Sequence, residues 1–186
     1  MNITFIRHTE VIKEYQHKYN GHIDIPLSQK GLEDAKKLAK KITQDFDITF
    51  CSDLKRTKQT LEQFTNITNI HYTKKLREKS WGKHEGLSFE EIEQTGVKYT
   101  TFLEWINNLD GESYEDFIIR IKNFFDNLQK QNYKNVLIVT HSGVIKVFLH
   151  VYKNIPLEEA FSYRLDYGDC LKYQLTGEES ELVKRV

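Results

Sequence analysis

Cysteine, proline and methionine are scarce in this chain, with two, two and one among 186 residues. Cys51 and Cys170 are far apart in the sequence and form no C-x-x-C pattern, so neither a zinc site nor a redox dithiol is indicated. We therefore expect no metal site, and we expect both cysteines to be small buried residues at strand starts.

An excess of charge of one sign is also absent, because 27 lysines and arginines balance 27 acidic residues and the two signs are interspersed. This balance does not favour nucleic acid or an anionic membrane as the main partner. A nucleic-acid-binding protein would also need a basic stripe with exposed aromatic rings, whereas the Tyr and Phe residues here follow predicted core faces. Any positively charged site must be local.

The sequence has no apolar run long enough to span a membrane, and its N-terminus lacks the pattern of a secretion signal. We therefore expect a cytoplasmic protein. The length suits one sizeable core and is short for two, and no internal repeat or linker is visible. We expect a single domain over residues 1–186, in which an excursion at about 80–112 covers the functional site.

Strand-like and helix-like segments alternate along the chain. Apolar segments rich in β-branched and aromatic residues predict strands at 3–6, 48–50, 67–72, 136–139 and 170–175. Helical spacing follows Ser28 and Ser113, both of which are typical helix start signals. The alternation predicts an α/β fold, a three-layer sandwich with a mostly parallel central sheet and helices on both faces. The polar tail at 177–186 is expected to extend past the core or to fray.

Polar side chains follow three of the predicted strands. Arg7 and His8 end the first strand, Arg56 falls in the first turn of a helix after the second, and His141 precedes a helix after the fourth. A cation at a helix N-terminus is unfavourable unless an anion lies nearby. The backbone N–H groups of Ser142 and Gly143 at that helix start would be free to bind a phosphate or a carboxylate.

Each of these residues has a simpler explanation when it is taken alone. An arginine at a strand end is usually solvated or ion-paired, and a histidine is usually a hydrogen-bonded structural residue. The joint arrangement of Arg-His, a first-turn Arg and His-Ser-Gly at three strand ends favours a phosphate pocket in an otherwise neutral protein.

Five ordered blocks of the chain resemble the histidine phosphatase superfamily, which includes cofactor-dependent phosphoglycerate mutases, fructose-2,6-bisphosphatases and α-ribazole phosphatases. The blocks are RHTE at 7–10, NGHIDIPLSQKG at 20–31, CSDLKRTKQT at 51–60, LREKSWGKHEG at 76–86 and VTHSGVI at 139–145. They span most of the chain, and five blocks in the family's order make the match specific.

The resemblance implies a role for each matching residue. His8 would be the nucleophile and would become transiently phosphorylated, Arg7, Arg56 and His141 would clamp the phosphate, and Glu78 would be the proton donor. A neutral imidazole can attack phosphorus without a metal ion, and two guanidinium groups with a protonated His141 could stabilise the developing charge.

Other matching positions leave alternatives open. Asn20 and Gly21 match a loop that approaches the phosphate, but Asn-Gly is also a common turn. Ser52 matches a strand-end serine and could instead cap the next helix. His22 and His84 lie in matching blocks and could face the pocket mouth. Three other histidines are expected to be structural or at the surface: His17, His71 and His150.

Three departures from the family pattern stand out. Thr9 and Ser142 occupy positions where the family most often has glycine, so close approach to the phosphate is more restricted. The stretch after Glu10 lacks the Asn that many members use as a phosphate ligand. The resemblance therefore predicts weaker or differently arranged binding of the ground-state phosphate.

The function that follows is hydrolysis of a small-molecule phosphate ester by a metal-independent phosphomonoesterase that uses no cofactor. The segment at 161–169 looks most like α-ribazole phosphatases, which act in assembly of the cobalamin nucleotide loop, so α-ribazole 5'-phosphate is one candidate substrate. The alternatives are a phosphoglycerate-type mutase, for which the chain is short, and a non-catalytic phospholigand-binding module. The sequence does not specify the substrate or the oligomeric state.

Overall fold

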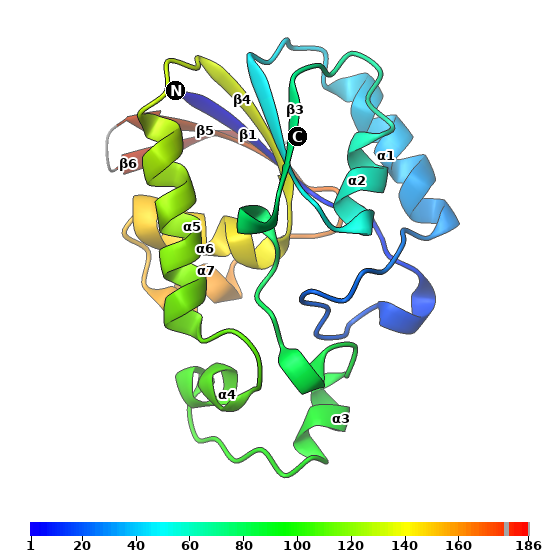
Figure 1. Ribbon diagram of the computed structural model, residues 1–186, viewed down its shortest axis with the longest axis vertical. Coiled ribbons are helices and arrows are strands. Elements are labelled where there is room, and N and C mark those ends of the chain that lie inside the picture. The colour runs from blue at the N-terminus through cyan, green and yellow to red at the C-terminus, as the bar shows by residue number, and fades with distance from the viewer. Residues whose placement is uncertain (177–178, 186) are drawn as a thin grey trace.

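The computed structural model describes residues 1–176 and 179–185, and its centre is a six-stranded sheet of order β3-β2-β4-β1-β5-β6 (Figure 1). The strands are β1 (Asn2–Arg7), β2 (Ile48–Ser52), β3 (Ile70–Thr73), β4 (Asn135–Thr140), β5 (Cys170–Thr176) and β6 (Glu179–Arg185). The first four are parallel to one another, and β5 and β6 are antiparallel additions at one edge. The mostly parallel sheet predicted from the sequence is confirmed.

Helices cover both faces of this sheet. They are α1 (Gln29–Lys41), α2 (Lys55–Leu61), α3 (Phe89–Glu93), α4 (Phe102–Asn108), α5 (Tyr114–Gln129), α6 (Ser142–Tyr152) and α7 (Leu157–Ser162), with 3-10 turns at Lys13–Tyr15, Lys74–Leu76 and Gly82–His84. In Figure 1, α1 and α2 lie on one side of the sheet and α5, α6 and α7 on the other. This arrangement is the predicted three-layer α/β fold.

The two long predicted helices begin at their expected caps. Ser28 Oγ accepts a hydrogen bond from Gly31 N at 2.9 Å, and Ser113 Oγ accepts one from Asp116 N at 3.0 Å. Each bond satisfies a backbone N–H group that has no partner inside the first helical turn. The caps therefore set where α1 and α5 start.

The central strand β1 shows why both faces of the sheet are buried. Phe5 packs on one face against Phe148 and Phe125, with ring centroids 4.8 and 5.8 Å away. Ile6 points to the opposite face and joins a second cluster that includes Leu38 of α1. Successive strand residues alternate between faces, so a strand covered on both sides is apolar along its length and becomes polar only where it ends.

The C-terminal tail differs from the prediction. Residues 179–185 form β6, which pairs antiparallel with β5 at the sheet edge, with Leu175 opposite Ser180 and Thr176 opposite Glu179. The free backbone groups along β5 provide hydrogen-bond partners that the polar composition of this segment does not reveal. The remaining residues of the predicted tail lie outside the described part of the chain.

Both cysteines are buried, as predicted. Cys170 begins β5, but Cys51 lies near the end of β2 and not at its start. Burial raises the pKa of the Cys51 thiol. Within residues 1–176 and 179–185, no group of three or more His, Cys, Asp or Glu side chains is arranged to hold a metal ion, and no helix is long and apolar enough to cross a bilayer.

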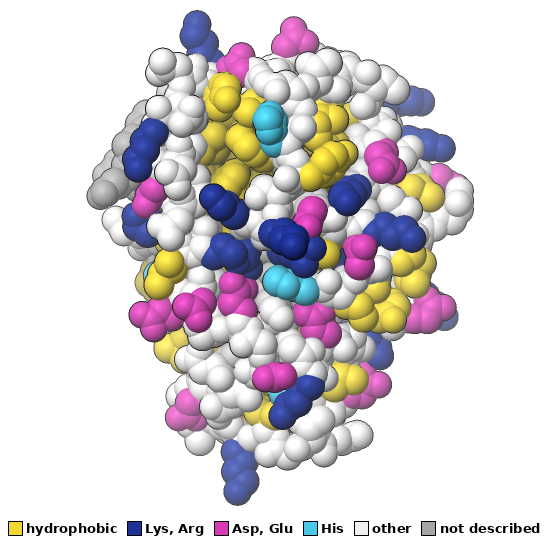
Figure 2. Space-filling model, in the orientation of Figure 1, with side chains coloured by type: hydrophobic (Ala, Val, Ile, Leu, Met, Phe, Trp, Pro, Cys, Tyr) yellow, Lys and Arg dark blue, Asp and Glu magenta, His cyan; other side chains and the backbone are white. Residues whose placement is uncertain are grey.

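The segment at 80–112 contains α3 and α4, which lie at one end of the molecule (Figure 1). Ile92 and Trp105 belong to the same buried cluster as Phe5, and Trp105 Nε1 donates to the Tyr19 hydroxyl at 2.9 Å. At the other end, hydrophobic side chains remain in view beside the edge strand β3, where a groove of about 390 Å³ lies between β3 and α5 (Figure 2).

Candidate active site

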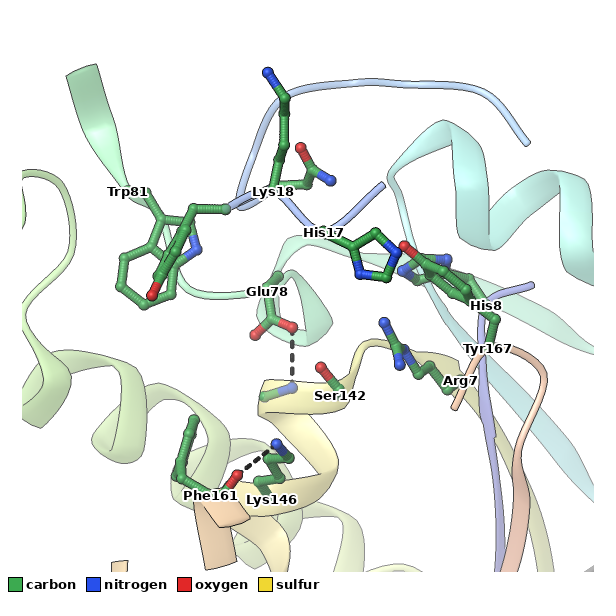
Figure 3. A pocket seen from close by; sticks show the side chains of 13 residues that line it. Arg7, His8, His17, Lys18, Glu78, Trp81, Ser142, Lys146, Phe161 and Tyr167 are labelled. Carbon is green, nitrogen blue, oxygen red and sulfur yellow. Dashed lines mark hydrogen bonds between the residues drawn. The ribbon is translucent and has the colours of Figure 1, made fainter. Parts of the chain in front are cut away.

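A pocket of about 210 Å³ opens where β1 and β4 end. The two strands are adjacent and parallel, with Arg7 opposite Thr140, so the residues that follow each strand meet at one edge of the sheet. Six of the predicted site residues line this pocket: Arg7, His8, Asn20, Glu78, Ser142 and Gly143 (Figure 3). The other four are not among its lining residues; they are Gly21, Ser52, Arg56 and His141.

His8 is buried and held in one tautomer. Its Nδ1 lies 2.8 Å from the carbonyl oxygen of Thr9, and a carbonyl can only accept, so Nδ1 carries the proton. Burial lowers the pKa of His8 well below its ordinary value, and the positive charges of Arg56 and Arg7 lower it further. The imidazole is therefore neutral, with a lone pair on Nε2, which is the state that a nucleophile needs.

Arg7 is fixed beside His8 by the segment after α7. Its guanidinium lies over the Tyr167 ring, 4.3 Å from the centroid, and its Nη1 donates to the Leu165 carbonyl. Burial lowers the pKa of Arg7, although the group remains a cation at neutral pH. Its Nε is buried and has no partner among the described residues. Tyr167 is thus a site residue that the sequence reasoning missed, although its block was noticed.

Arg56 occupies the first turn of α2, as predicted, but most of its donors hold a loop. Only 1% of its surface is exposed, Nη1 donates to Ile23 O at 2.8 Å, and Nη2 donates to Asn20 O and Gly21 O at 2.9 and 2.7 Å. Its Nε is buried without a partner in the described chain. Burial lowers the pKa of Arg56 to about 10, while the nearby Glu78 acts in the opposite direction.

His141 is fully buried behind the pocket and stands edge-on to His8, with ring centroids 5.3 Å apart. Its Nε2 lies 2.9 Å from Ser52 Oγ, and its Nδ1 has no described partner. Burial, followed by the charge of Arg56, lowers the pKa of His141 well below its ordinary value. These effects favour a neutral His141 in the pocket without a ligand, whereas the predicted protonated His141 concerns the step of phosphoryl transfer.

Ser52 ends β2, which agrees with its match to a strand-end serine, but its side chain does not cap the next helix. Its hydroxyl contacts His141 and orients the ring, while the N-cap position of α2 is taken by Leu54, which makes no side-chain cap. A completely buried serine at a strand end can thus contact a residue that follows the neighbouring strand instead of capping the helix that comes next in the sequence.

The carboxylate of Glu78 lies at the N-terminus of α6. Its Oε2 accepts from Gly143 N at 2.9 Å, and its Oε1 accepts from Lys79 N at 3.1 Å (Figure 3). The prediction that the Gly143 N–H is free for a phosphate is thus wrong, because a carboxylate already uses it. A Cβ on Gly143 would lie 1.9 Å from Glu78 Oε1, so the absence of a side chain there allows this approach.

Asn20 and Gly21 differ in their contributions. Asn20 lines the pocket, its Nδ2 donates to the Tyr15 carbonyl, and its Oδ1 is buried without a described partner. Gly21 packs behind the wall, where a Cβ would lie 2.2 Å from the carbonyl oxygen of Lys79. Gly21 therefore allows two chain segments to approach, and its carbonyl accepts from Arg56.

Three further histidines lie in or near the site. His17, expected to be structural or at the surface, lines the pocket with a left-handed backbone, φ 59°. Figure 3 draws its side chain among those that line the pocket. His22 contacts the Glu78 carbonyl through Nε2 at 3.0 Å, while His84 is buried and accepts from Asp110 N at 3.0 Å. A left-handed position for a non-glycine residue has no simple sequence signal.

Three buried nitrogen atoms around His8 lack partners in the described chain: Arg7 Nε, Arg56 Nε and His141 Nδ1. Unpaired buried polar atoms are costly, and native proteins keep few of them unless a ligand satisfies them. Two guanidinium groups beside a neutral imidazole suit a bound anion that carries several acceptor oxygens, such as a phosphate.

Comparison with known proteins agrees with this geometry. The family model described as histidine phosphatase superfamily (branch 1) matches residues 3–186. The adenosylcobalamin/alpha-ribazole phosphatase of Escherichia coli K12 is 26% identical over 90% of this chain and 87% of its own. Phosphoserine phosphatase 1 of Hydrogenobacter thermophilus is 25% identical over 89% of this chain and 81% of its own. The crystal structure of the alpha-ribazole phosphatase from Shigella flexneri superposes with a TM-score of 0.87 at 26% identity, covering 98% of this chain and 94% of that one.

Proposed function

The chain belongs to the histidine phosphatase superfamily (branch 1), and we propose that it is a metal-independent phosphomonoesterase whose intermediate is a phosphohistidine at His8. One observation supports this most strongly. A neutral, tautomerically fixed imidazole stands beside three buried nitrogen atoms that lack partners in the described chain. Such a site sets a nucleophile beside nitrogen atoms that suit the oxygens of a phosphate.

In the first step, Nε2 of His8 attacks phosphorus while the bond from phosphorus to the leaving oxygen breaks. Arg7 and Arg56 neutralise the charge that spreads over the other phosphoryl oxygens. A bound phosphate dianion would also offset the two guanidinium charges, which favours protonation of His141 only when substrate is present.

Glu78 completes the cycle as a proton carrier. It gives a proton to the leaving oxygen, which departs as an alcohol, and it then takes a proton from the water that attacks the phosphohistidine. That second attack releases inorganic phosphate and restores both His8 and Glu78. Glu78 lines the same pocket as His8, as this role requires.

The substrate proposed is a small phosphate ester, with α-ribazole 5'-phosphate as the first compound to examine. Tyr19, Trp81 and Phe161 line the outer part of the pocket, and the Tyr19 and Trp81 rings meet edge to face with centroids 5.0 Å apart. Such rings suit a leaving group with a flat aromatic base. The segment at 80–112 begins two residues after Glu78, and we propose that it forms the roof of the site.

The test is phosphate release from p-nitrophenyl phosphate by the wild type and by His8→Ala, with a chelator present throughout. His71→Ala, on the edge strand β3, is the matched control. Chelator-resistant turnover that disappears only in His8→Ala is expected. Turnover that persists in His8→Ala, or that the chelator abolishes, would overturn the proposal. A mutase would instead pass the phosphoryl group to a second acceptor molecule and release little phosphate.

A further inference from the structure

Arg120 of α5 uses all of its donors on the segment that carries Glu78 and on one carboxylate. Its Nη1 donates to the carbonyl oxygens of Lys75 and Arg77 at 2.8 and 2.9 Å, and its Nη2 donates to that of Glu78 at 3.2 Å. In Figure 1 this segment descends from β3 alongside α5. Three contacts from one side chain define the path of the backbone here.

Glu112 holds the Arg120 guanidinium from the opposite side. Its Oε1 accepts from Nε and its Oε2 from Nη2, both at 2.7 Å, and the two side chains are only 16% and 20% exposed. Together with the three carbonyls, this pair satisfies all five N–H groups of the arginine. A bidentate and partly buried pair fixes orientation in a way that a single exposed ion pair does not.

The position of the Glu78 backbone matters because its carboxylate has little freedom. Oε2 is bound to the first turn of α6 through Gly143 N, and the space around Oε1 is so restricted that a Cβ on Gly143 would overlap it. A shift of the backbone at Glu78 would therefore withdraw the carboxylate from the pocket. His22 contacts the same carbonyl at 3.0 Å but comes from a loop on the other side.

We propose that Arg120, oriented by Glu112, is a positioning residue that places Glu78 for proton transfer to the leaving group. This inference rests on the proposed function, in which Glu78 is the proton donor. Arg120 does not line the pocket and acts through the carbonyl contacts alone. Glu112 is the last residue of the segment at 80–112, so the same pair connects that segment to the proposed proton donor.

The consequence is a dependence on the leaving group. An ester with a good leaving group, p-nitrophenyl phosphate, needs little proton transfer, whereas phenyl phosphate needs more. If Arg120 only stabilises the fold, its substitution lowers kcat equally for both esters. If it positions Glu78, kcat falls more for phenyl phosphate than for p-nitrophenyl phosphate. KM changes little in that case, because the residues that bind the phosphate are unchanged.

The experiment compares Arg120→Lys, Glu112→Gln, Glu78→Gln and the double variant Glu78→Gln/Arg120→Lys on both esters. Lys122→Gln is the control, because Lys122 lies on the same helix in an exposed pair with Asp126. For phenyl phosphate, we expect kcat to fall about 10- to 100-fold in Arg120→Lys, with a smaller fall in Glu112→Gln. For p-nitrophenyl phosphate, the fall should be less than about threefold, and the double variant should be no worse than Glu78→Gln.

Thermal unfolding accompanies each assay, and Glu112→Gln provides the milder change if Arg120→Lys does not fold. Equal losses on the two esters, or additive losses in the double variant while Glu78→Gln alone discriminates between the esters, would overturn the positioning role and leave the proposed function standing. Failure of Glu78→Gln itself to discriminate would overturn the proton-donor role and this inference together.

Discussion

Gly143→Ala should displace Glu78, the proposed proton donor, and leave His8, the proposed nucleophile, unchanged. The added Cβ would lie 1.9 Å from Glu78 Oε1 and 2.9 Å from its Cδ, both closer than atoms can approach. The backbone of α6 yields less easily than a side chain, so the added Cβ should force the Glu78 carboxylate out of this position while the helix stays in place. The bond from Gly143 N to Oε2 is then lost.

The expected cost to stability is small. Loss of a hydrogen bond to a charged group costs about 1.5–3 kcal/mol, and replacement of glycine by alanine within a helix returns about 1 kcal/mol. The free energy of unfolding, measured by urea denaturation, should therefore fall by about 0.5–2 kcal/mol. Gly96→Ala is a useful control, since Gly96 has φ 83° and an added Cβ there would meet nothing within 4 Å, so it tests the strain of losing a glycine away from the site.

The effect on catalysis should be larger and selective. General acid catalysis contributes about 10²–10⁴ in rate, so kcat for phenyl phosphate should drop at least about 100-fold, close to the loss in Glu78→Gln. Inhibition by inorganic phosphate should persist, because Arg7 and Arg56 are unchanged. Wild-type turnover of phenyl phosphate by Gly143→Ala would refute the argument that this contact places the proton donor.

Further predictions concern the buried cations and histidines. The NMR signals of His8 and His141 should remain those of neutral imidazole as the pH falls through 6.5. The free energy of unfolding should decrease below that pH, because the unfolded chain then binds protons that the folded histidines do not. Titration of either histidine at pH 6.5 would contradict this. Arg56→Lys should cost about 3 kcal/mol or more of unfolding free energy in urea, since one ammonium cannot reach three carbonyls; a change within experimental error would contradict it. Tyr167→Leu should weaken binding of inorganic phosphate about fivefold by calorimetry, because the Arg7 guanidinium loses the ring on which it lies; unchanged affinity would argue against that support.

Much of the fold could be predicted because the signals are local. The apolar runs of β1 and β4, and the serine caps before α1 and α5, follow from side-chain chemistry over a few residues. The edge strand β6 could not be predicted in this way, because its pairing depends on the free backbone of β5 and not on its own polar composition.

The site was predictable to the extent that strand ends meet in a parallel sheet. Arg7, His8 and His141 come together for that reason, and the burial that lowers the pKa of both histidines depends on the packing of distant elements. The use of the Gly143 N–H by Glu78 was not visible, since the two residues are 65 positions apart.

The supporting contacts were even less accessible to sequence reasoning. Arg120 lies on a helix whose pattern indicates only an amphipathic face, and nothing local marks its bonds to three carbonyls some 42–45 residues earlier. Tyr167 lies in a loop, where the sequence does not indicate which residue its ring contacts, yet the Arg7 guanidinium lies over that ring. Such contacts depend on the tertiary structure and cannot be predicted from the local sequence.

The proposed phosphohistidine can be detected directly. We would quench the enzyme during turnover of p-nitrophenyl phosphate and map phosphorylation by mass spectrometry under conditions that preserve phosphoramidates. We expect one acid-labile phosphoryl group on the peptide that contains His8, and none in His8→Ala. Product formation with no phosphoryl group on His8, or with the group on another residue, would contradict it.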